Sequence, residues 1–153
     1  MESRVLLRTA AEEDLPHIAR LDREVFGDAA YPFFVLRQLF DAGFTLVVVD
    51  DSEGICAYAL ALALASEGRG WVLALAVGPR QRGTGLGREL MRETLCHLRS
   101  LRVREVLLTV EPANASAIRL YRSLGFTERR GATGHVRDYF GPGEDRLLLS
   151  LTL

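Results

Sequence analysis

The chain has 153 residues, of which 48% are hydrophobic and 25% are charged, and its formal net charge at pH 7 is −1. This length suits a single domain over residues 1–153, and the apolar content excludes a disordered chain. The near-zero charge argues against binding to the phosphate backbone of nucleic acids, and the longest apolar run, residues 55–65, is too short to span a membrane.

The first elements predicted are a strand and two helices. Residues 5–8 form a short apolar strand, and Thr9 precedes an acidic stretch at residues 12–14, so we expect Thr9 to cap the first helix. Apolar residues at helical spacing continue to Phe26, and we expect this helix to serve mainly in packing. A second helix follows and ends at Gly43, a residue type that often terminates helices.

An aromatic segment, Tyr31-Pro32-Phe33-Phe34, lies between these two helices. Three rings beside a proline in a loop have two interpretations: they wall a substrate cleft, or they anchor the second helix to the core. Tyr31 and Phe34 are therefore candidate substrate-binding residues.

Three strands are predicted next. Residues 44–50 and 55–65 flank a short turn as an antiparallel hairpin, and residues 71–77 form a third strand after another turn. The third strand stops at Gly78-Pro79. A helix then runs to Leu98 with apolar residues at helical spacing on one face.

The loop at residues 82–87, Arg-Gly-Thr-Gly-Leu-Gly, joins the third strand to this helix and is suited to bind an anion. The first turn of a helix has N–H groups without partners, and the helix dipole places partial positive charge there. The glycines lack a Cβ, so an anion can approach the backbone closely, and the arginine adds a full charge.

Two common phosphate-binding loops are excluded by the residues present. A Walker loop requires a lysine, and all 19 basic residues of this chain are arginines. A dinucleotide-binding fingerprint requires a glycine where Arg88 or Leu90 stands. The loop therefore serves another phosphorylated ligand.

The C-terminal part completes a mixed α/β fold. We predict a strand at 103–110, a helix at 114–123 and a final strand at 146–153 with alternating leucines. The long loop at 131–143 carries Tyr139 and is a candidate substrate loop, because loops of this length are often functional. The predicted order is β-α-α-β-β-β-α-β-α-β-β, with about seven strands in one α/β (α+β) sheet.

The sequence also indicates a compartment. Glu2 and Arg4 stand where a secretory signal requires an apolar segment, so we expect a cytoplasmic protein, as a monomer or a homodimer. Cys56 and Cys96 are far apart and lie in apolar segments, and we expect both to be buried, reduced thiols. No metal-ligand spacing occurs, so no metal site is predicted.

Two blocks of sequence resemble the GCN5-related N-acetyltransferase (GNAT) superfamily. Residues 82–87 match its [RQ]-x-x-G-x-[GA] loop, and residues 114–126 match its N-x-x-A-x-x-L-Y-x-x-x-G-F segment. The ordered pair is far more specific than either block alone. The resemblance implies the GNAT fold, which has the predicted order of elements, and an acetyl-CoA-dependent enzyme in which an amine attacks the thioester directly.

The resemblance also implies site residues. Tyr121 matches the general acid that meets the departing sulfur of CoA; its alternative role is that of a core aromatic on its helix. The candidates named above from their own segments, Tyr31, Phe34 and Tyr139, would then bind the acceptor. Acetyl-CoA would be held by the third strand, the glycine loop and the helix-capping asparagine: Leu75, Ala76, Val77, Arg82, Gly83, Thr84, Gly85, Leu86, Gly87 and Asn114.

The catalytic base is where the sequence departs from the family. Ribosomal-protein alanine N-acetyltransferases, which this chain resembles most, have a glutamate where Thr109 stands. Glu111 lies two residues on, about 6.6 Å along the same strand face, and is the candidate base acting through a water molecule. The alternative is a solvated carboxylate at the end of the strand.

A weak base favours an acceptor that loses its proton easily. An α-amine with a pKa of about 8 is neutral in roughly a tenth of molecules at pH 7, whereas a lysine amine with a pKa of about 10.4 is almost fully charged. We therefore expect the N-terminal α-amine of a protein or peptide as acceptor. The alternatives are a small-molecule acetyltransferase, acting on an amino acid, antibiotic or metabolite, and a non-catalytic acyl-CoA-binding module.

Overall fold

The computed structural model describes residues 4–129 and 134–153, which form two compact units. One unit comprises Met1–Leu62 and Val72–His97, and the other comprises Ala63–Trp71 and Leu98–Leu153. Within the described ranges, the helices are all too short or too polar to cross a bilayer.

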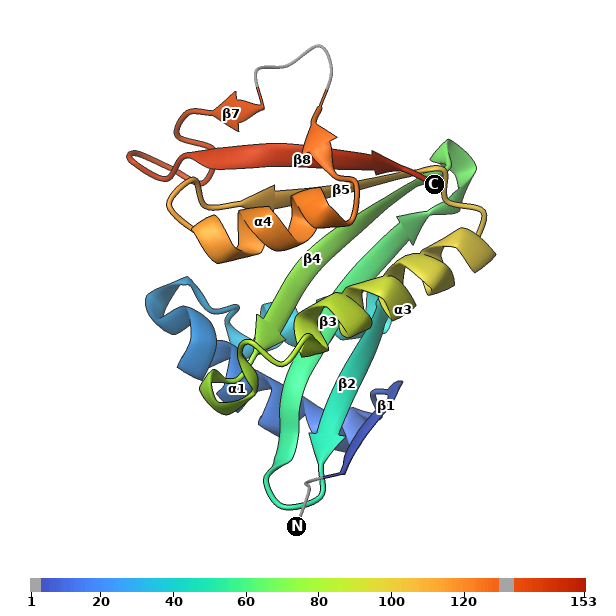
Figure 1. Ribbon diagram of the computed structural model, residues 1–153, viewed down its shortest axis with the longest axis vertical. Coiled ribbons are helices and arrows are strands. Elements are labelled where there is room, and N and C mark those ends of the chain that lie inside the picture. Colours follow the sequence, from blue (N-terminus) through green and yellow to red (C-terminus); the bar gives the residue numbers. More distant parts are fainter. Residues whose placement is uncertain (1–3, 130–133) are drawn as a thin grey trace. The chain divides into compact units, whose positions relative to one another are not determined.

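The first unit contains four neighbouring strands and three helices (Figure 1). Its strands follow the order β1-β2-β3-β4, and the pairs β1/β2 and β2/β3 are antiparallel. Its elements are β1 (Val5–Thr9), α1 (Leu15–Phe26), α2 (Phe33–Ala42), β2 (Phe44–Asp50), β3 (Gly54–Leu64), β4 (Arg69–Val77) and α3 (Leu86–Ser100), the last three of which extend past the unit's boundaries.

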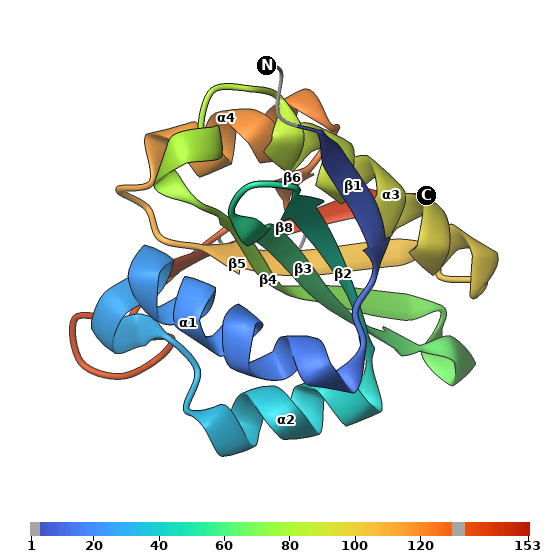
Figure 2. The same ribbon diagram turned by 90° about the horizontal axis from the view of Figure 1, so that it is seen from below.

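Alternation along the strands produces two buried faces in this unit. Val47 and Tyr58, opposite each other on β2 and β3, pack with Ile18 of α1. The neighbouring residues, such as Val48, face the other way and pack with Leu90 of α3. Figure 2 accordingly shows α1 and α2 on one side of these strands and α3 on the other. A two-residue period thus places the helices on opposite faces.

The second unit is built around β5 (Glu105–Val110). The start of β4 pairs with β5 in parallel, and β8 (Arg146–Thr152) pairs with it antiparallel. Two short strands, β6 (Thr127–Glu128) and β7 (His135–Val136), both pair with β8. The strand order is β4-β5-β8-β6, and the remaining helix is α4 (Ala115–Ser123).

The predicted fold class and order of elements are confirmed, with one addition near the C-terminus. Over the described ranges the mixed sheet is mostly antiparallel and has eight strands, because β7 precedes β8 within the segment we interpreted as the loop 131–143. Residues 131–133 of that loop lie outside the described residues.

The predicted cap of the first helix is wrong. Thr9 is the last residue of β1, and a 3₁₀ turn, Glu12–Asp14, precedes α1. Among the described residues, no side chain caps α1 at Asp14. The Asp14 carboxylate instead ties the start of α1 to the preceding segment: it accepts a hydrogen bond from the Ala11 N–H at 2.7 Å and two from the Arg8 guanidinium at 2.7 and 3.0 Å. A carboxylate that is held by arginine is a stronger acceptor than a threonine hydroxyl.

The predicted burial of both cysteines is half correct, since Cys56 is buried and Cys96 is exposed. The buried stripe of α3 consists of Leu86, Leu90, Met91, Thr94 and Leu98. Cys96 lies two residues from both Thr94 and Leu98, on the outer side of the helix, because helical neighbours on one face are three or four residues apart.

Replacing Asp14 tests the anchor between β1 and α1. Asp14→Ala removes the partner of a backbone N–H and of Arg8, so we expect the free energy of unfolding in urea to fall by about 1–3 kcal/mol. The hydrogen bond from Arg8 holds the pKa of Asp14 below its usual value. The difference in the free energy of unfolding between variant and wild type should therefore be complete above about pH 4 and should be lost as the pH falls through the lowered pKa of Asp14.

The control is Asp41→Ala. Asp41 is exposed and pairs with Arg37 one helical turn away, so its removal should change stability by less than about 0.5 kcal/mol. Equal losses in the two variants would contradict the assigned role of Asp14.

Candidate functional site

The turn after β4 is held close to β3. The Gly78 N–H donates to the Cys56 carbonyl at 2.8 Å, and a Cβ at position 78 would stand 3.1 Å from that same oxygen. Only glycine fits this approach without a shift of the backbone. A 3₁₀ turn, Pro79–Gln81, then leads into the loop at residues 82–87.

The glycine loop has the geometry of an open turn before a helix. Gly83 and Gly85 have φ angles of +76° and +81°, and a Cβ on either would meet no atom within 4 Å. These positions need glycine for their backbone conformation, and the space beside them is open. The Gly85 carbonyl accepts the Glu89 N–H at 3.1 Å, the first hydrogen bond of α3, and the Thr84 hydroxyl donates to the Gln81 carbonyl at 2.5 Å.

The arginines near this loop differ in their partners. Arg80 pairs with Glu53 of the β2–β3 turn. The Arg82 side chain is exposed and forms neither a hydrogen bond nor an ion pair with the described residues. Arg82 and the N–H groups at the start of α3 can therefore bind an anion together.

The side chains of the predicted cofactor strand alternate between two buried surroundings. The Ala76 side chain is buried in the core beneath α1 and α2, whereas Leu75 and Val77 are half-buried beside the cluster that includes Leu90. The register of β4 with β5 runs from Arg69 to Trp71. It does not include Leu75 or Val77, so that pairing does not use their backbone groups.

Tyr31 is anchored in the first unit by hydrogen bonds, one of them to Asp22, a carboxylate that the sequence analysis did not identify. The Tyr31 hydroxyl donates to the Leu73 carbonyl, and its N–H donates to Asp22 Oδ2, both at 2.8 Å. Asp22 is 1% exposed and also accepts the Tyr58 hydroxyl. Burial, and secondarily the Asp22 charge, raise the pKa of both tyrosines. The sequence signal was a carboxylate at a helical spacing of four from Ile18, on the apolar face.

This network favours the anchoring interpretation for Tyr31, because both of its polar groups are committed to the protein. Phe34, the other candidate in this segment, is 68% exposed at the start of α2. Its ring is free to contact a ligand or a partner.

In the second unit, Asn114 caps α4 as its sequence position indicates. Its Oδ1 accepts the Ala117 N–H at 3.2 Å, and its own N–H donates to the Glu111 carbonyl at 3.0 Å. Glu111 is exposed and follows the last residue of β5, while Thr109 is half-buried within the strand. Glu111 is therefore a solvent-accessible carboxylate next to the cap of α4.

Tyr121 is 8% exposed, and its ring packs edge-on against Phe126 with centroids 5.9 Å apart. Burial raises the pKa of Tyr121 to about 12. The Tyr121 hydroxyl forms no hydrogen bond with the described residues. Among those residues, the one fully buried side-chain polar atom without a hydrogen-bond partner is Thr45 Oγ1. The Tyr121 hydroxyl is therefore not fully buried and keeps some contact with solvent.

Tyr139 belongs to a turn that is tied by aspartates. The Asp138 side chain accepts the Gly143 N–H at 2.8 Å, and Asp145 accepts the Asp138 N–H at 3.0 Å. Tyr139 is 39% exposed and packs edge-on against Phe140, with ring centroids 4.7 Å apart. The described part of the candidate substrate loop thus presents two aromatic side chains.

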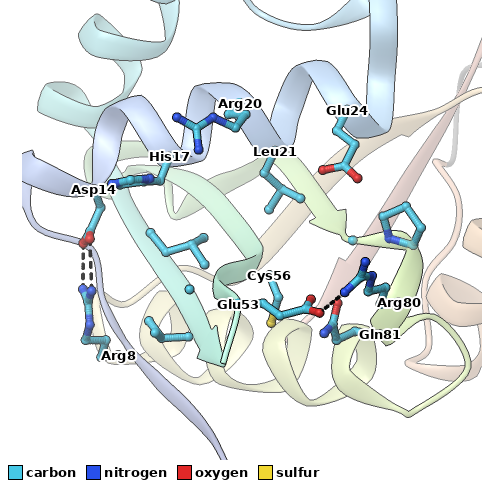
Figure 3. A pocket seen from close by; sticks show the side chains of 15 residues that line it. Arg8, Asp14, His17, Arg20, Leu21, Glu24, Glu53, Cys56, Arg80 and Gln81 are labelled. Atoms are coloured by element: carbon cyan, nitrogen blue, oxygen red, sulfur yellow. Dashed lines mark hydrogen bonds and ion pairs between the residues drawn. The ribbon is translucent and has the colours of Figure 1, made fainter. Parts of the chain in front are cut away.

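A cavity of about 630 Å³ lies within the first unit, between α1 and the Gly78–Gln81 turn (Figure 3). None of the site residues predicted from the sequence lines it. Arg20 and Glu24 extend toward it from α1, the helix to which we assigned a packing role. Two charges one turn apart on either side of Leu21 were the available signal.

A family model described as the acetyltransferase (GNAT) family matches residues 7–126. Among curated relatives, the mycothiol acetyltransferase of Thermobispora bispora is 53% identical over 58 residues, which are 38% of this chain and 20% of the relative. That of Actinosynnema mirum is 36% identical over 88 residues, which are 58% of this chain and 29% of the relative. The match thus spans between about a fifth and a third of their length.

Several solved structures share the fold. The ribosomal-protein-S18-alanine N-acetyltransferase of Escherichia coli has a TM-score of 0.82 at 22% identity, over 97% of this chain and 94% of that one. The NatC complex bound to Gag peptide and CoA contains a chain with a TM-score of 0.84 at 20% identity, over 98% and 99% of the two chains.

The family match covers well over half of the residues, and it includes the glycine loop, Asn114 and Tyr121. The resemblance inferred from the two motifs is therefore confirmed. This chain belongs to the acetyltransferase (GNAT) family.

Proposed function

We propose that this protein is an acetyl-CoA-dependent N-acetyltransferase, in which a primary amine attacks the thioester directly. The observation that carries the proposal is the open turn before α3. Two glycines with positive φ and free space beside them precede a 15-residue helix, next to Arg82, whose side chain has no partner among the described residues. This arrangement fits the diphosphate of coenzyme A, because backbone N–H groups and a guanidinium converge on one anion site.

The remaining cofactor contacts follow from the family. The backbone of Leu75 and Val77 would bind the pantetheine arm, with Ala76 fixing the strand from its buried side, and Asn114 would contact the same arm or the phosphates. Acetyl-CoA supplies the activated acetyl group. The protein contributes orientation of the two substrates and hydrogen-bond donors for the thioester oxygen.

Tyr121 is proposed as the group that stabilises the departing thiolate. With its pKa at about 12 and a thiol pKa of about 8.5, complete proton transfer would be uphill by about 5 kcal/mol. A hydrogen bond from the neutral phenol requires no such transfer and stabilises the negative sulfur. Glu111, exposed beside the cap of α4, is proposed to accept the proton of the amine through water.

For the acceptor we favour the α-amine of a protein or peptide N-terminus. Thr109 cannot serve as a base, so the enzyme depends on an amine that is partly neutral near pH 7. The second candidate is a small-molecule amine, which is supported by the mycothiol acetyltransferases among the relatives. In both cases Phe34 and Tyr139 are proposed to contact the acceptor, and Tyr31, which is bound to Asp22 and Leu73, is proposed to fix the position of the segment that carries Phe34.

An acceptor panel tests the function. Release of CoA from acetyl-CoA is measured with peptides that have a free N-terminus, the same peptides with a blocked N-terminus and an internal lysine, amino acids, and amino sugars. We expect the free peptides to exceed the blocked ones at least about tenfold in kcat/KM. A higher kcat/KM with amino acids or amino sugars than with free peptides would favour the second candidate, a small-molecule amine, as the acceptor. If none of the amines causes release of CoA although the protein binds CoA, the remaining interpretation is a non-catalytic acyl-CoA-binding module.

Removing the free arginine tests the diphosphate site. Arg82→Ala loses a charge-assisted hydrogen bond, so we expect the dissociation constant for CoA to rise about 10- to 100-fold in titration calorimetry. Arg23→Ala, an exposed arginine on α1 that lacks a side-chain partner in the described structure, is the matched control and should bind as wild type. Wild-type affinity in Arg82→Ala would contradict the site.

Replacing the phenol tests the role of Tyr121. Tyr121→Phe keeps the ring contact with Phe126 and removes the donor, so kcat should fall about 10- to 100-fold with little change in the KM for acetyl-CoA. Because the raised pKa keeps the phenol protonated through pH 10, wild type should show no alkaline decline from this group. An alkaline limb near pH 9 that disappears in Tyr121→Phe would refute this assignment.

A further inference from the structure

The cavity in the first unit has the dimensions of a ligand site. Its volume of about 630 Å³ falls in the range of roughly 300–1,000 Å³ typical of small-molecule pockets. Its walls come from α1, the ends of β1 and β2, the start of β3 and the Gly78–Gln81 turn (Figure 3). The whole lining belongs to one compact unit.

The charges that line the cavity are balanced in number. Three arginines and three carboxylates contribute, and two of each are already paired: Arg8 with Asp14, and Arg80 with Glu53. A lining of this kind has no net charge that would attract a simple anion or a simple cation. His17, the third titratable side chain of α1 that lines the cavity beside Arg20 and Glu24, lies near Asp14.

The other two charged side chains of the lining, Arg20 and Glu24, are unpaired within the described residues. Arg20 and Glu24 are exposed, and neither has a hydrogen-bond or ion-pair partner in the described part of the chain. They lie one turn apart on α1, with the arginine first, which is the less favourable order for a pair within a helix. Both side chains line the cavity, and Figure 3 shows them on α1 without an interaction between them, with the Glu24 carboxylate directed toward the Gly78–Gln81 turn.

An apolar floor lies between the two charges. Leu21 of α1 stands between Arg20 and Glu24 in the sequence and is 5% exposed. Val49 and Ile55, from β2 and β3, also line the cavity, are half-buried and pack against the same core cluster as Leu21. An aliphatic group bound against these side chains would be partly removed from water.

We infer that this cavity binds a zwitterionic α-amino acid with an apolar side chain. The carboxylate of the ligand pairs with Arg20, its ammonium pairs with Glu24, and its side chain packs on Leu21, Val49 and Ile55. A ligand with only one charge leaves either Arg20 or Glu24 without a partner, so recognition requires both charges.

This site is separate from the residues proposed for acetyl-CoA, since none of those residues lines the cavity. The inference therefore does not depend on the proposed function. Each can fail without the other, because coenzyme A and an amino acid are titrated separately.

Titration calorimetry with L-leucine and two close analogues tests the inference. Isoamylamine lacks the carboxylate of leucine, and isocaproate lacks its ammonium. We expect wild type to bind leucine at least about tenfold more tightly than either analogue. Arg20→Ala and Glu24→Ala should each weaken leucine binding about tenfold or more, and each should bring leucine down to the level of one analogue.

The controls separate this site from a general charge effect and from the acetyl-CoA site. Arg23→Ala on α1 and Glu93→Ala on α3 change exposed charges outside the cavity and should bind leucine as wild type does. Arg82→Ala should also bind leucine normally, and Arg20→Ala should bind CoA normally. Failure of wild type to bind leucine, valine or methionine, or equal leucine affinity in Arg20→Ala, Glu24→Ala and wild type, would overturn the inference.

Discussion

The contact between Gly78 and the Cys56 carbonyl determines where β4 ends and in which direction the chain leaves it. Because no side chain separates the turn from β3, the backbone passes directly over the neighbouring strand. One side of this turn continues into the glycine loop and α3, and its residues from Gly78 to Gln81 also form a wall of the cavity under α1. A single close approach of backbone to backbone thus supports both candidate ligand sites.

The sequence predicted the fold well because the dominant signals are local. The apolar runs at residues 44–50 and 55–65, separated by a short polar turn, predict the hairpin that β2 and β3 form, and the glycine-rich loop at residues 82–87 precedes a helix as predicted. Asn114 was recognisable as a helix cap for the same reason: the hydrogen bond that it accepts comes from a residue three positions later. Such features depend on neighbours in the chain and require no tertiary information.

What the sequence did not predict depends on contacts between distant residues. Asp22 accepts hydrogen bonds from Tyr31 and Tyr58, which are 9 and 36 positions away, and the Asp14 carboxylate before α1 is held by a guanidinium six positions earlier. Arg20 and Glu24 of α1 line a cavity only because β2, β3 and the Gly78–Gln81 turn supply the rest of its lining, and this arrangement exists only in the folded chain. Strand β7 has two residues and is held by β8, so no periodicity could reveal it.

The burial of tyrosines also limits the conditions under which this fold persists. Tyr31, Tyr58 and Tyr121 all have pKa values raised chiefly by burial, so the folded chain holds these three phenolic protons more tightly than the unfolded chain does. Their contribution to stability is complete below the ordinary tyrosine pKa of about 10 and is lost as the solution becomes more alkaline. Phenolate absorbance from these side chains should therefore appear together with alkaline denaturation. The ultraviolet absorbance of the protein can thus be used to follow its unfolding at high pH.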